Sequence, residues 1–137
     1  MKGSGAMAGM ASAAMLLAPG CGGGAGKAPA SADEPLRRAS FRSLAAREFL
    51  FSCPGGAARG ETRAAIARHE ELKQLALGKD AGHAVALGEN DWAGLRRHDE
   101  RGPCAPGDKA YFEALAAFRG ALDTLAGRIA DHRGAAP

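Results

Sequence analysis

Two short clusters place an imidazole beside carboxylates, the combination that general acid–base catalysis and metal binding use. His69 precedes two glutamates, and His98 precedes Asp99 and Glu100. No two of the four histidines have the HExxH spacing that puts two metal ligands on one helical face. We therefore expect no catalytic residue, metal ligand or cofactor. The alternative is a small enzyme or metal-binding module that uses His98, Asp99 and Glu100, or His69.

The histidines also have structural roles that require no catalysis or metal binding. Adjacent residues on a helix do not face each other, so His69 and Glu70 are not an obvious catalytic pair. His69 falls on the apolar side of its expected helix, where a hydrogen-bonded, partly buried histidine is common. His132 follows the last expected helical turn, where a basic residue complements the helix dipole.

A second group of residues has the composition of a binding site. Trp92 is the only tryptophan, and Arg96, Arg97 and Arg101 follow it closely. Tryptophan and arginine are enriched among the residues that dominate interface energies. We therefore name Trp92, Arg96, Arg97 and Arg101 as candidate partner-binding residues. The alternative is that Trp92 fills a gap in a small core.

Charge limits the class of partner. The chain has 18 Lys and Arg against 15 Asp and Glu, a formal net charge of +3. This balance is ordinary for solubility and lacks the concentrated basic surface that nucleic acid requires. We therefore expect no nucleic-acid partner.

The N-terminus carries the most informative pattern. Lys2 precedes an apolar, uncharged segment from Ala6 to Ala18, and Gly20 and Cys21 follow it. The segment is shorter than the ~20 residues that a membrane-spanning helix needs. This order resembles the signal peptide of bacterial lipoproteins. In that family a leucine usually lies three residues before the acylated cysteine, and here Leu17 lies one position earlier than that.

The resemblance implies cleavage before Cys21 and a lipid on its thiol. The chain resembles, in particular, the small uncharacterised lipoproteins of Gram-negative bacteria. The resemblance implies an anchor in the outer or inner membrane, with the domain facing the periplasm. Gly22 is compatible with transfer to the outer membrane. The alternative is a soluble periplasmic or secreted protein, cleaved after Ala30 under the small-x-small rule.

Cysteine parity agrees with the lipoprotein interpretation. Three cysteines leave one unpaired in an exported protein, and acylation of Cys21 leaves Cys53 and Cys104 as one pair. Both lie in turn sequences rich in proline and glycine, and an oxidising compartment permits a disulfide between them. A pair of small buried thiols is the alternative.

The fold is expected to be mainly α, a small three-helix domain. Helices are predicted over 35–52, 61–77 and 108–132. The last has Tyr111, Leu115, Phe118, Leu122, Leu125 and Ile129 at alternating spacings of four and three, the pattern of a buried helical stripe. Packing of this stripe against the other two helices is favoured over a seam between chains.

The domain organisation follows from these elements. Residues 1–20 form the signal peptide, 21–33 the lipidated cysteine and a flexible tether, and 34–137 the helical domain. A long irregular connection spans 79–107, with a short strand or extended arm at 83–87 and a short helix capped by Asn90 or Asp91. With the lipoprotein resemblance, we expect a non-enzymatic binding or envelope-support module, held at the membrane by its lipid and with an envelope protein or polymer as partner. A small hydrolase inhibitor with a rigid loop near Cys104 is another alternative.

Overall fold

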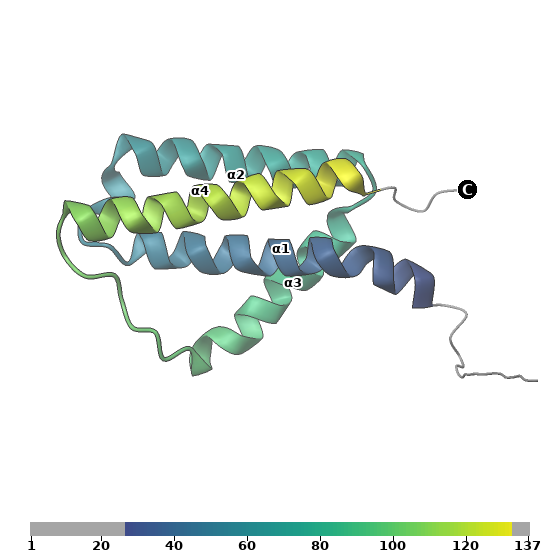
Figure 1. Cartoon of the computed structure of the whole chain (residues 1–137), viewed down its shortest axis with the longest axis horizontal. Coiled ribbons are helices and arrows are strands. Elements are labelled where there is room, and N and C mark those ends of the chain that lie inside the picture. Colours follow the sequence, from purple (N-terminus) through teal and green to yellow (C-terminus); the bar gives the residue numbers. More distant parts are fainter. Residues whose placement is uncertain (1–26, 133–137) are drawn as a thin grey trace, which may run out of the picture. The chain divides into compact units, whose positions relative to one another are not determined.

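The computed structural model describes residues 27–132, with side chains from Asp33 onwards. The chain divides into two units, Met1–Ala32 and Asp33–Pro137, and the second is described here by itself. The helices of the described residues are shown in Figure 1. They are α1 (Lys27–Phe51), the 3-10 turn η3 (Gly56–Ala58), α2 (Gly60–Gly78), α3 (Gly82–Leu95), the 3-10 turn η4 (Arg96–His98) and α4 (Asp108–Asp131). The first six residues of α1 belong to the first unit.

The core is built around α4, as its sequence stripe predicts. All six residues of the stripe are buried, and Phe118, Leu122, Leu125 and Ile129 are fully enclosed. Gly120 and Gly127 lie on its exposed side. Helix α2 packs along α4, where the Thr62 and Tyr111 hydroxyls form a hydrogen bond at 2.8 Å. The stripe thus packs within the chain.

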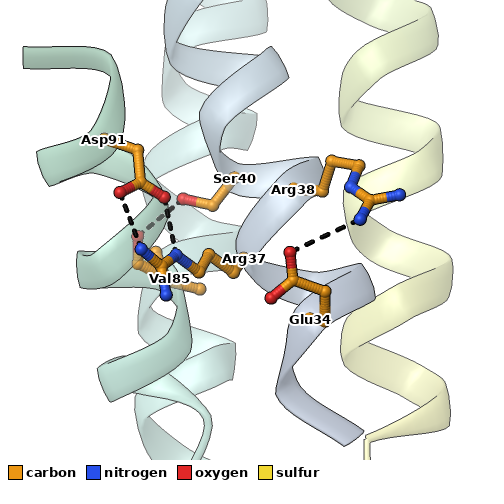
Figure 2. A network of polar contacts seen from close by, with 6 residues as sticks. All are labelled: Glu34, Arg37, Arg38, Ser40, Val85 and Asp91. Atoms are coloured by element: carbon orange, nitrogen blue, oxygen red, sulfur yellow. Dashed lines mark hydrogen bonds and ion pairs between the residues drawn. The ribbon is translucent and has the colours of Figure 1, made fainter. Parts of the chain in front are cut away.

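Helix α3 crosses α1 through polar contacts (Figure 2). The Ser40 hydroxyl donates to the Val85 carbonyl oxygen at 2.7 Å, and Arg37 donates from Nε and Nη2 to the two carboxylate oxygens of Asp91 at 2.6 and 2.8 Å. This two-point contact lowers the pKa of Asp91 and raises that of Arg37. Between these contacts Gly88 lies directly against the α1 backbone.

The connection expected over 79–107 is more regular than the sequence indicates. Residues 83–87 belong to the α-helix α3, so the strand or extended arm is wrong. The buried residues of this helix recur at helical spacing; they are Ala84, Val85, Gly88 and Trp92. The pattern is hard to recognise in the sequence because Ala84 and Gly88 are too small to stand out as core residues. Asn90 and Asp91 lie inside α3, so the expected helix cap at these residues is wrong. Within 79–107, only the turn at 79–81 and residues 99–107 lie outside helices, and the described chain has four α-helices where three were expected.

The boundaries of the other helices differ slightly from expectation. Helix α1 begins at Lys27, so Pro35 lies inside it rather than in its first turn. Alanines at 28, 30 and 32 favour this extension. The later part of the expected tether is therefore helical, and residues 1–26, including Cys21, lie outside the described residues.

The disulfide between Cys53 and Cys104 is confirmed, with a Cα–Cα distance of 4.6 Å. It joins the end of α1 to the segment before α4, and both residues are buried. The mainly helical fold clamped by one disulfide is therefore as the sequence predicts.

Candidate functional site

The candidate binding residues lie where α3 ends and the chain turns back toward α4. Trp92 is in the last turn of α3, Arg96 and Arg97 are in η4, and Arg101 is in the irregular segment that follows. The Cys53–Cys104 disulfide ties the end of this segment to α1. The Cys104 amide also donates to the Ser52 hydroxyl at 2.9 Å, which fixes the same point a second time.

Two of the three arginines are engaged within the domain. Arg96 Nη1 lies 3.0 and 3.3 Å from the two carboxylate oxygens of Glu48 in α1. Arg101 Nη2 donates to Asp99 at 3.0 Å, and the Arg101 guanidinium lies 4.7 Å from the centre of the Phe49 ring. These contacts hold the segment against the C-terminal turns of α1.

Arg97 differs from its neighbours. Its side chain is exposed, and no ion pair within residues 33–132 involves it. Leu95, just before it, is 49% exposed. Of the three candidate arginines, Arg97 is therefore the one that forms no ion pair with a carboxylate among residues 33–132.

Trp92 has the position that the core-filling alternative requires. It is 5% exposed and meets Phe41 of α1 edge-to-face, with ring centres 5.7 Å apart. Its Nε1 is buried without a hydrogen-bond partner in the described part of the chain. Trp92 thus supports the segment from beneath, while the arginines form its outer surface.

A cavity of about 240 Å³ opens beside this segment. Two guanidinium groups, two carboxylates, two aromatic side chains and one hydroxyl line it. Its lining residues are Glu48, Phe49, Ser52, Trp92, Arg96, Asp99, Arg101 and Gly102.

The first histidine cluster is part of the core. His69 is fully buried between α2 and α4, with its ring edge-to-face on Phe118, and Arg47 Nη1 donates to its Nδ1 at 3.1 Å. Burial, and then the positive charges of Arg47 and Lys73, lower the pKa of His69 from 6.5 to about 4. The ring is neutral at pH 7 and enclosed by protein. This position fits the expectation of a hydrogen-bonded histidine on the apolar side of its helix.

The second cluster lies at the surface. Asp99 accepts from both the amide and the guanidinium of Arg101, while His98 and Glu100 are exposed. His132 lies directly after α4, with Nδ1 3.8 Å from Asp33. Within residues 33–132, no group of three His, Cys, Asp or Glu is arranged to hold a metal ion.

Several residues of this region have no signal in the sequence. Glu48 approaches Arg96, and Phe49 approaches Arg101, only because α1 and α3 cross and the disulfide closes the loop. Ser52, immediately before Cys53, is the exception: the expected disulfide alone places it near the 99–107 segment.

None of the helices within residues 27–132 is both long and apolar enough to cross a membrane. Comparison of the whole chain with protein-family models, curated proteins and solved structures gives no match.

Proposed function

We propose that this chain is an exported lipoprotein, anchored through acylated Cys21 and facing the periplasm from the outer or inner membrane. The Cys53–Cys104 disulfide is the observation that supports the proposal, because such bonds persist mainly in oxidising compartments. Their pairing leaves Cys21, directly after the apolar segment, as the remaining cysteine of the three.

The helical domain then acts as a non-enzymatic binding module for an envelope protein or polymer. The contact surface is the segment from Glu89 to Arg101, with Arg96, Arg97 and Arg101 outward and Trp92 beneath. The disulfide and the Arg96–Glu48 pair hold this segment in place before binding, which reduces the entropy lost on association.

The anchor is tested by the intact mass of protein extracted from membranes of an expressing Gram-negative host. We expect a mature N-terminus at Cys21 with a lipid-modified mass, and retention of the precursor in the Cys21→Ser variant. A mature, lipid-free chain that begins at Ser31 would overturn the proposal.

A further inference from the structure

Helix α4 carries a second stripe on the side opposite its buried one. The residues of this outer stripe are again spaced by four and three, and all of them are exposed; they are Glu113, Ala117, Gly120, Thr124, Gly127 and Asp131. This is the spacing with which two helices pack side by side along their length. No helix within residues 33–132 covers the outer stripe, so this face of α4 lacks a partner in the domain.

The two glycines of the outer stripe have no steric requirement within the domain. A Cβ added at Gly120 or Gly127 meets nothing within 4 Å, whereas one added at Gly88 meets the backbone of α1. Glycine in a helix interior is less stable than alanine, so both residues weaken α4 without a packing reason among the described residues. Their small size suits the close approach of another helix, because the side chains at the contact set the distance between two helix axes.

The charges along this face are also without partners. Four charged residues of α4 are exposed and take part in no ion pair among residues 33–132; they are Lys109, Glu113, Arg128 and Asp131. Read from the start of the helix, their signs are plus and minus in the first turns and plus and minus in the last two turns. The same four charges therefore match their own order when it is reversed.

This order selects the orientation of a second copy of α4. In a parallel pair of identical helices each charge faces its own copy, so every charged contact is repulsive. In an antiparallel pair centred on Gly120, Glu113 lies beside the partner's Arg128 and Lys109 lies beside the partner's Asp131. Each contact occurs twice because the interface is two-fold symmetric. The two helix dipoles also run in opposite directions in this arrangement, which favours it further.

We propose that the chain forms a homodimer through the outer stripe of α4, with the two helices antiparallel and Gly120 at the two-fold axis. Ala117 then lies opposite the partner's Thr124, so only small side chains separate the two helices near the axis. The dimer goes beyond the proposed contact with an envelope protein or polymer. It requires neither that partner nor the lipid on Cys21.

Sedimentation velocity of the full chain, with its disulfide formed, tests the dimer over a range of concentrations. We expect a reversible monomer–dimer equilibrium. Gly120→Gln adds a side chain at the axis and should raise the dimer dissociation constant by at least about tenfold. Its monomer should stay folded by circular dichroism, because glutamine is the better helix former and an added Cβ has space there. Gly94→Gln, also without a neighbour within 4 Å but on α3, is the matched control.

Charge reversal tests the orientation. Glu113→Arg and Arg128→Glu should each weaken the dimer by about tenfold, because each places two like charges together at two symmetric contacts. The double variant exchanges the two charges and should restore the wild-type dissociation constant. Within one chain the two residues are roughly 22 Å apart along the helix, so a restored affinity reports a contact between chains. Arg119→Glu, exposed on the same helix but outside the outer stripe, should change nothing.

A chain that stays monomeric at every concentration would overturn the proposal. A dissociation constant insensitive to Gly120→Gln would also overturn it, and is the result expected if association runs through the apolar segment 6–18 instead. A double charge-reversed variant that stays as weak as the single ones would contradict the antiparallel pairing. None of these outcomes alters the mass of the membrane-extracted protein, which tests the anchor separately.

Discussion

Gly88 of α3 lies against the carbonyl oxygen of Arg37 in α1, closer than any residue with a side chain permits. An added Cβ would overlap that oxygen and would come within 2.8 Å of the Ser40 Cβ. One turn further along α3, the Arg37 side chain holds Asp91 at two points (Figure 2). The crossing of α1 and α3, which places Glu48 opposite Arg96, therefore depends on a residue without a side chain.

Gly88→Ala should destabilise the fold by about 1–3 kcal/mol, because the added methyl group overpacks the helix crossing. Gly94→Ala is the matched control on the same helix, where an added Cβ meets nothing within 4 Å. It should stabilise the fold by up to about 1 kcal/mol through helix propensity. Urea unfolding followed by circular dichroism measures both, and equal effects of the two variants would contradict the close contact.

The buried histidine predicts a stability loss in acid. The pKa of His69 is about 4 in the folded chain and near 6.5 when unfolded. Between these values the unfolded chain binds the proton and the folded chain does not, so the free energy of unfolding falls as pH drops from about 6.5 to 4. The expected loss from this group is about 3 kcal/mol, since each pKa unit corresponds to ~1.4 kcal/mol.

Urea unfolding at several pH values measures this slope. His69→Phe keeps an aromatic ring against Phe118 and should flatten the dependence over that range. His83→Gln, at an exposed position, should leave it unchanged. A wild-type slope that persists in His69→Phe would show that another group is responsible.

Removal of the disulfide should lower the free energy of unfolding by about 4 kcal/mol, as chain entropy predicts for a loop of this length. Replacement of both Cys53 and Cys104 by serine, compared with the wild type under non-reducing conditions, measures the loss. Peptide mapping without reduction should recover the two cysteines in one linked fragment. Free alkylation of both thiols in native protein would contradict the bond.

Phe118→Ala should cost about 3–5 kcal/mol, because the side chain is fully enclosed and its loss leaves a cavity. Phe112→Ala, on the same helix but 44% exposed, should cost far less. Thermal unfolding of the two variants provides the comparison, and similar melting temperatures would contradict the assigned face of α4.

The parts of this fold that follow from sequence are those with strong periodic signals. The stripe of α4 is long and composed of large apolar residues, so its burial and helical state are both predictable. Cys53 and Cys104 stand in turn sequences, and their pairing is expected once Cys21 is assigned to the lipid, because they are then the two remaining cysteines. These features depend on local pattern or simple arithmetic.

Helix α3 shows where local pattern is insufficient. Its contact face includes Gly88 and Ala84, whose small size permits close approach of the helices but adds little apolar area. The sequence therefore shows no helical stripe of large apolar residues there, and the short apolar run at 83–87 resembles a strand. The surroundings of Arg96 and Arg101 are similarly non-local. Glu48 and Phe49 reach them only through the helix crossing, which no sequence spacing encodes.

The binding role of the 89–101 segment is the central claim, and quantitative co-purification from native envelopes tests it most directly. Arg96→Ala and Arg97→Ala change exposed side chains, whereas Trp92→Ala would also lower stability because Trp92 is buried. We predict that both arginine variants melt as the wild type does and lose one specific envelope partner, while Arg119→Ala retains it. Full recovery of that partner with both Arg96→Ala and Arg97→Ala would contradict the claim.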